Sequence, residues 1–414
     1  MILQLVKAWP ITALDSPEKY HLPVSIALDA KGRQLVISRF EDVVWDFWPY
    51  LPQENLAQNF KCINWAVMLP DGSRLTDPQH TELLENTKAF IWSLWAGPID
   101  GRKRPTMRTL IAKFKSTIHL LRWMISQGMT RFAHLNGRTL DYVPVAKISA
   151  KKTLVSETTL QHRLQILEDL YLQRKKLKDA LSVHPWPEQT CKKLTGSSLG
   201  DDYMTSTERI PDRIAKDLAK AALEYVENKA KHLLAAWDAV KATADAGQLR
   251  GLSASHISTY YVSRVARDYG FNGARALNDE LRHLRNACYI VINLFSGIRN
   301  SEMMSLATHC ISHGKNYDGS TDLTWLYGTI YKTGQRTHKW LVPAVVEMAV
   351  HTMERYSEPF RAKLLAEESE LVKDLECANE RNKKALARRL ETIRRQKNRL
   401  FLGERPRDHR QIQV

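Results

Sequence analysis

Residues 294–306, LFSGIRNSEMMSL, place an arginine and a glutamate at a spacing that could hold an anion. The pattern predicts that an apolar helix ends at Ser296 and Gly297 and that a new helical turn begins near Arg299. Glu302 follows three residues later, close enough to orient the guanidinium group of Arg299. A guanidinium can donate two parallel hydrogen bonds to a carboxylate or to a phosphate. The segment therefore predicts either a phosphate-binding arginine or a structural ion pair at a helix end.

A lysine on a predicted β-hairpin is the second candidate for chemistry. The run LTWLYGTIYKTGQRTHKWLVP predicts two strands, residues 324–331 and 338–342, joined by a turn around Gly334. Lys332 would then lie at the rim of the hairpin. By itself, such a lysine is an ordinary residue of a strand edge.

Together the two segments resemble the tyrosine recombinase (phage integrase) family, over about residues 80–360. The family's Gly-x-Arg-x-x-Glu-x-x-x-Leu box is matched by Gly297, Arg299, Glu302 and Leu306, and its lysine hairpin by Lys332, Thr333, Gly334, Val342 and Pro343. The order, the spacing and the predicted secondary structure of the two segments agree with that family.

The resemblance implies roles for three residues in DNA strand exchange at short recombination sites. In such enzymes a tyrosine attacks a DNA phosphate to form a 3′-phosphotyrosyl link. Arg299 would hold the phosphate oxygens, Lys332 would protonate the departing 5′ oxygen, and Glu302 would brace the arginine. The reaction needs neither a metal nor another cofactor, because fixed positive charge can stabilise the transition state.

The family's second box, His-x-x-Arg, and its nucleophilic tyrosine are not found in these 414 residues. Tyr356 follows Lys332 too closely, His351 and Arg355 are four apart instead of three, and His409 has no arginine three residues later. We therefore expect a truncated reading frame or a piece of a longer integrase that binds DNA without cutting it. The alternatives are a non-catalytic DNA-binding regulator or remnant, and a helical adaptor in which Arg299 and Glu302 form only a salt bridge.

The elements that would position these residues suggest a mainly α fold with a small β-hairpin or sheet. We expect a small mixed or β-rich region at 1–78, a helical core-binding domain at 79–192 and a linker at 193–209. An incomplete recombinase catalytic domain would follow at 210–414. Within it, residues 361–400 are acidic and then basic, which favours a helical hairpin or one exposed helix.

The charge balance favours a nucleic-acid partner. Lysine and arginine number 61 against 45 acids, a formal net charge of +16, and basic proteins gain affinity for polyanions by counterion release. Each basic run alone is more often a solvated face, but several on one helical bundle predict a surface that follows DNA phosphates. The residues chosen for that surface are Arg102, Lys103, Arg104, Arg108, Lys113, Lys115, Lys175 and Lys176.

Composition also bounds the cellular setting and the partners. Five scattered cysteines with no Cys-x-x-Cys pair suggest neither a disulfide framework nor a zinc cluster. The sequence shows no signal peptide and no apolar run long enough to span a membrane. We expect a cytoplasmic, nucleoid-associated prokaryotic protein whose partners are double-stranded DNA and further copies of itself assembled on DNA, with no small-molecule substrate.

Overall fold

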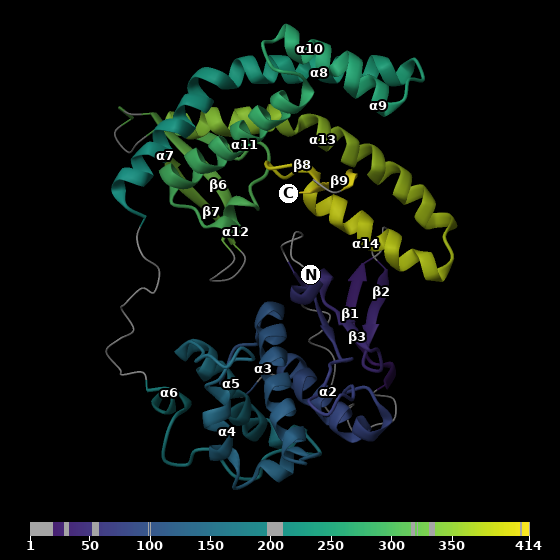
Figure 1. Ribbon diagram of the computed structural model, residues 1–414, viewed down its shortest axis with the longest axis vertical. Helices are drawn as coiled ribbons and strands as arrows, with labels where there is room; N and C mark the ends of the chain where they lie inside the picture. The colour runs from purple at the N-terminus through teal and green to yellow at the C-terminus, as the bar shows by residue number, and fades with distance from the viewer. Residues whose placement is uncertain are drawn as a thin grey trace. The chain divides into compact units, whose positions relative to one another are not determined.

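A computed structural model describes residues 20–28, 33–51, 58–97, 99, 101–196, 210–315, 319–320, 322–330, 336–405 and 408–413. The fold is mainly helical with small antiparallel sheets, so the coarse prediction of fold class is confirmed (Figure 1). The described residues up to 196 form one compact unit, unit 1, and those from 210 onward form a second, unit 2. None of the helices in these ranges is long and apolar enough to cross a membrane.

Unit 1 combines two short strand pairs with a helical bundle. Strand β1 (Pro23–Leu28) pairs with β2 (Gln34–Arg39), and β3 (Val44–Asp46) pairs with β4 (Cys62–Asn64), both antiparallel. The helices are α2 (Thr81–Ala96), α3 (Met107–Ser126), α4 (Thr139–Ala146), α5 (Glu157–Leu172) and α6 (Cys191–Leu194). Short 3₁₀ turns lie at Trp48–Tyr50, Gln58–Phe60, Pro78–His80, Phe132–Leu135 and Arg174–Lys176. Residues 79–192 are thus mainly helical, as the sequence predicts.

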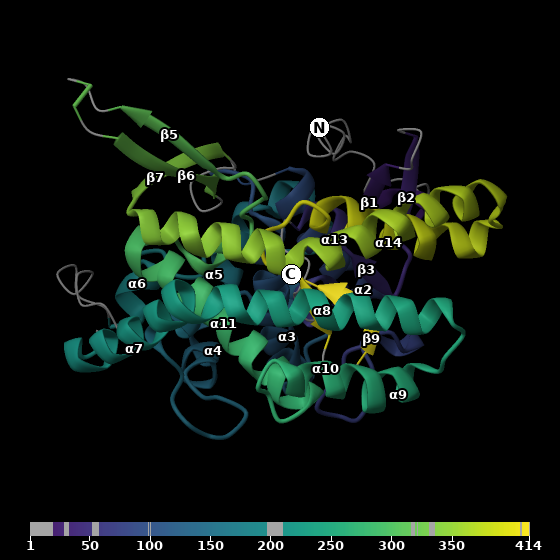
Figure 2. The ribbon, with the colours of Figure 1, turned by 90° about the horizontal axis from the view of Figure 1, so that it is seen from above.

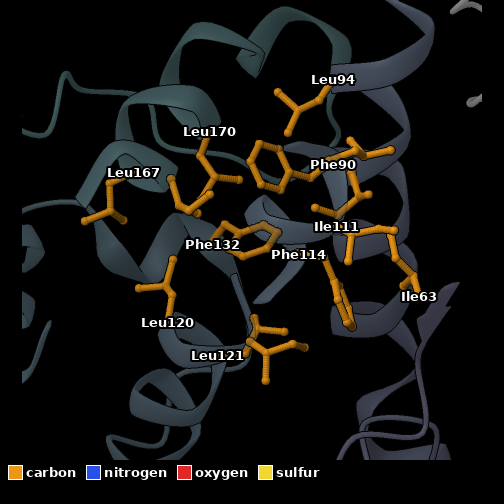
Figure 3. Packing of buried hydrophobic residues seen from close by; sticks show 14 of the residues in the cluster. Ile63, Phe90, Leu94, Ile111, Phe114, Leu120, Leu121, Phe132, Leu167 and Leu170 are labelled. Atoms are coloured by element: carbon orange, nitrogen blue, oxygen red, sulfur yellow. The ribbon is translucent and has the colours of Figure 1, made fainter. Parts of the chain in front are cut away.

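One hydrophobic core runs through the whole of unit 1. Trp45 of β3 packs edge-on against Trp92 of α2, and the ring of Trp65 lies 5.1 Å from that of Phe114 in α3. Figure 3 shows part of this core. The boundary predicted at residue 78 therefore does not separate two domains, because the strands on one side and the helices on the other bury the same apolar side chains.

Most of the predicted linker at 193–209 lies outside the described residues, and residues 193 and 194 end α6. Unit 2 then begins with a helical layer. Pro211 directly precedes its first helix, a position where the fixed φ of proline and its missing N–H are tolerated. The helices are α7 (Asp212–Glu224), α8 (Ala230–Leu249), α9 (Ala254–His256), α10 (Ser263–Asp268), α11 (Ala274–Ser296) and α12 (Asn300–Met303), with π-helical stretches at Tyr225–Lys229 and Ile257–Val262.

A three-stranded antiparallel sheet follows α12, in the order β5 (Ile311–Lys315), β6 (Asp322–Ile330), β7 (Arg336–Val342). The predicted hairpin corresponds to β6 and β7, and β5 was not predicted. Side chains of alternate residues point to opposite faces of a sheet. One face is turned toward the helices, since Leu326 is buried and His313 contacts Glu347 of the next helix.

Of the two forms predicted for residues 361–400, a helical hairpin or one exposed helix, the structure has the hairpin, and its first helix begins earlier, at Ala344. Helix α13 (Ala344–Cys377) and helix α14 (Glu380–Gln396) lie side by side in both ribbon views (Figures 1 and 2). The acidic part of α13 faces the basic part of α14, with Glu367 bound by both Nε and Nη2 of Arg389 at 2.6 Å. The chain then runs through 398–402 into the strand pair β8 (Gly403–Arg405) and β9 (Asp408–Gln413).

Candidate functional site

The candidate site lies at the turn between α11 and α12. Helix α11 ends at Gly297, whose φ of 66° is the left-handed conformation that glycine adopts without strain. The side-chain amide of Asn293 donates from Nδ2 to the carbonyl oxygen of Ile298 at 2.8 Å and closes the turn. Arg299 is the cap residue before α12, so its position follows directly from the helix stop that the sequence predicts.

Arg299 and Glu302 form the ion pair that the sequence predicts. Nη1 of Arg299 lies 2.9 Å from Oε1 of Glu302, and the backbone amide of Arg299 donates to Oε2 at 3.1 Å. The Glu302 side chain is 2% exposed, whereas that of Arg299 is 57% exposed. One edge of the guanidinium is therefore held by a buried carboxylate, and the rest of the group faces solvent.

The last residue of the box, Leu306, packs into the core of unit 2. It is fully buried, and a Cβ built on Gly328 of β6 would lie 3.1 Å from its side chain. A glycine at 328 thus lets the sheet approach the segment that carries Arg299. Lys332, Thr333 and Gly334 lie outside the described residues, so the structure places β6 and β7 on either side of the lysine but not the lysine itself.

A segment distant in sequence supports this turn. The backbone amide of Leu400 donates to the carbonyl oxygen of Leu306 at 2.8 Å. The backbone amide of Thr308 donates to the carbonyl oxygen of Asn398 at 2.9 Å. Arg399 also donates from Nη1 to the carbonyl oxygen of Ser305. Sequence reasoning missed this support, because nothing in residues 398–400 marks them as neighbours of the box.

A hollow of about 250 Å³ lies beside the turn. Tyr289 on its wall donates its hydroxyl hydrogen to Oδ1 of Asn300, the residue after Arg299, at 3.0 Å. The lining combines a cation and amide with apolar side chains: Arg285, Asn286, Tyr289, Met304, Phe401, Leu402 and Gly403. In the part of the chain that the structure describes, no group of three His, Cys, Asp or Glu side chains could hold a metal ion.

The predicted basic surface of unit 1 gathers residues from three separate segments. Asp169, a fully buried residue of α5, binds Nη1 of Arg102 at 3.1 Å and is also bound by Nζ of Lys113. Lys176 donates to the carbonyl oxygen of Gly97 at 3.0 Å. The loop after α2, the first half of α3 and the end of α5 therefore meet on one region of unit 1.

The eight predicted basic residues differ in what they contact. Arg104 lies over the ring of Trp95, with Cζ 5.0 Å from the centroid, and Lys115 lies over Phe60 at 4.3 Å. Together with Arg102, Lys113 and Lys176, they have structural contacts. Lys103, Arg108 and Lys175 are exposed and have no such contact among the described residues.

The residues considered as parts of a missing second box are engaged elsewhere. Tyr356 is buried in unit 2, where its ring stacks on Trp237 at a centroid distance of 6.1 Å. His351 contacts Glu347 and Glu354, and Arg355 pairs with Asp238. The burial of Tyr356 indicates core packing and not a nucleophile.

Three comparisons with known proteins return nothing. No protein-family model matches the chain, no curated protein matches it, and no solved structure matches it at a significant level. The resemblance to tyrosine recombinases thus depends on the motif residues between 297 and 343 and on the geometry of the described ones.

Proposed function

We propose that this protein binds duplex DNA as a member of the tyrosine recombinase family, with Arg299 as a ligand of a backbone phosphate. The observation that carries the proposal is the asymmetry of the Arg299–Glu302 pair. A guanidinium has five N–H donors, and the buried carboxylate of Glu302 accepts from one nitrogen. The exposed remainder is a fixed, half-desolvated fork of the kind that binds phosphate in two parallel hydrogen bonds.

Unit 1 supplies the second proposed contact. Lys103, Arg108 and Lys175 extend into solvent from a region whose other cations are anchored. Anchored cations such as Arg102 and Lys113 are already partly neutralised by Asp169, so we assign the phosphate contacts to the three open side chains.

The parent reaction in this proposal is strand exchange by a multimer assembled on DNA, with Arg299 holding the scissile phosphate and Lys332 protonating the departing 5′ oxygen. A non-catalytic regulator of the same family would make the same DNA contacts. A helical adaptor would make no such DNA contacts. It would need the charged faces of α13 and α14 for a partner helix, but in this fold those faces pair with each other, as Glu367 does with Arg389.

The test is binding of a fluorescein-labelled, mixed-sequence DNA duplex, followed by anisotropy between about 50 and 200 mM salt. Arg299→Ala should weaken binding by about 1 to 3 kcal/mol, or roughly 5- to 150-fold, because it removes a charge-assisted phosphate contact. It should also reduce the slope of log affinity against log salt by about one. Arg299→Lys should recover part of the affinity, since a lysine keeps the charge but not the fork.

Arg138→Ala is the matched control. Arg138 and Asp141 form an exposed pair at 3.3 Å with the same i, i+3 spacing, so this variant removes the same charge without touching the site. Because Arg299→Ala leaves Glu302 buried without its cation, the double variant Arg299→Ala/Glu302→Gln is measured as well. Equal affinities for the Arg138 and Arg299 variants would refute the proposal.

A further inference from the structure

The face of the β5–β7 sheet that points away from α13 carries two aromatic side chains and a lysine. The strand register places Trp325 opposite Leu341 and Tyr327 opposite Lys339 on this face, with the Thr329–Thr337 pair beyond them. Tyr327 is 38% exposed and Leu341 is 55% exposed. We call Trp325, Tyr327, Lys339 and Leu341 the outer-face platform.

Trp325 is the centre of this platform. Its indole lies across strand β5, where a Cβ built on Gly314 would be 3.7 Å from Nε1. Nζ of Lys339 lies 4.3 Å from the centroid of the indole ring, so one face of the ring is reached by an ammonium group from an exposed side chain. The indole itself is half-buried, so a ligand that stacks on this ring face has to displace the lysine.

In the described strands this face carries one cation, Lys339, and no acid, because the register puts Lys315, Arg336 and Asp322 on the opposite face. The two threonines at the end of the platform add hydroxyl groups that can bind phosphate or sugar oxygens. A half-buried indole and an exposed tyrosine next to one lysine and two hydroxyl groups favour a ligand that carries both flat rings and negative charge.

We propose that the outer-face platform binds single-stranded DNA, with an unpaired base stacked on Trp325 and the Lys339 ammonium moved to a neighbouring phosphate. Every base has a flat face that can stack on an aromatic ring, and such stacking needs no particular sequence. Bases inside a duplex are already stacked on each other, so the platform selects unpaired strands. The choice of DNA over RNA rests on the proposed function, whereas the stacking site itself does not depend on Arg299.

The experiment measures binding of the full chain to a fluorescein-labelled oligothymidylate and to the duplex used for Arg299. Trp325→Ala should weaken binding of the oligothymidylate by about 5- to 100-fold, as expected for loss of one stacked base, and should leave duplex binding within about twofold. Trp325→Phe should retain most of the affinity, because phenylalanine still stacks. Lys339→Gln should lower affinity and reduce the salt dependence of single-strand binding.

Tyr260→Ala is the matched control, because Tyr260 is an exposed aromatic residue of unit 2 far from the sheet in sequence. Urea unfolding of each variant shows whether it is folded, and Trp325→Phe and Lys339→Gln keep the test decisive if Trp325→Ala unfolds. The proposal is overturned if the Trp325 variants bind the oligothymidylate like the wild type, if Tyr260→Ala loses as much affinity, or if an oligouridylate binds more tightly. A loss with Trp325→Ala but none with the Arg299 variants would support the platform and refute only the phosphate clamp.

Discussion

The burial of Glu302 makes the stability of unit 2 depend on Arg299. Among the described residues, Arg299→Ala leaves a carboxylate that is 2% exposed with only the backbone amide of residue 299 as a donor. An uncompensated buried charge costs several kcal/mol, and solvent access at the position of Arg299 should reduce this, so we expect a loss of about 2 to 4 kcal/mol in the free energy of unfolding. Glu302→Gln keeps the shape and leaves the arginine free to be hydrated, so it should cost about 1 to 2 kcal/mol.

The double variant Arg299→Ala/Glu302→Gln should be more stable than Arg299→Ala alone, because it removes the stranded charge. A coupling energy of about 1 to 2 kcal/mol is expected from this cycle. The assay is urea unfolding of the full chain, with hydrogen exchange of peptides covering residues 274–306 to assign the change to unit 2. If Arg299→Ala costs no more than Arg138→Ala, the carboxylate does not depend on the arginine, and the view of Glu302 as its brace is wrong.

Two further predictions concern buried polar contacts in each unit. In unit 1, Nζ of Lys88 donates to the carbonyl oxygens of Phe40, Glu41 and Asp42 at 2.8 to 3.1 Å. Lys88→Met should therefore lower the free energy of unfolding by about 2 to 4 kcal/mol, measured by urea unfolding. An unchanged urea midpoint would contradict this. Burial lowers the pKa of Lys88 from 10.5 to about 8. Between these values the unfolded chain binds more protons, so the stability of the wild type should rise with pH there and the slope should be smaller in Lys88→Met. In unit 2, Oγ of Ser357 donates to the carbonyl oxygen of Leu400 at 2.6 Å. Ser357→Ala should lower the free energy of unfolding by about 1 to 3 kcal/mol and speed hydrogen exchange in residues 396–402. Equal exchange rates in the variant and the wild type would show that this contact does not hold the segment.

Local patterns in the sequence predict the parts of the fold that depend on neighbouring residues. The helix stop at Gly297 and the Arg299–Glu302 contact both arise within a few residues, and both are present. Strand β5 was missed because its five residues, ISHGK, are short and mixed in polarity and show no clear alternation. It becomes a strand because β6 supplies its hydrogen-bond partners.

Contacts between distant residues could not be predicted in the same way. A pattern shows that Trp45 is apolar and clustered, but not that it packs on Trp92, which is why the strands of unit 1 were assigned to a separate region. Likewise, Arg102 and Lys113 were predicted to contact DNA phosphates, and their common partner, Asp169, is 67 and 56 residues away from them in the sequence. Of the predicted basic surface, the open residues are therefore fewer than the sequence suggests.

The support of the Arg299 turn by residues 398–400 has a consequence for how the two ends of unit 2 are coupled. The carbonyl oxygens of Ser305 and Leu306 accept hydrogen bonds from Arg399 and Leu400, and Leu400 is in turn held by Ser357 of α13. Any change that shifts α14 relative to α13 must move this segment or break these bonds. The position of the Arg299 guanidinium then depends on the packing of the helical hairpin as well as on its local sequence, because these bonds hold the segment that directly follows α12. A substitution in the hairpin can thus alter the site without touching a ligand, which is a property that inspection of the box alone could not reveal.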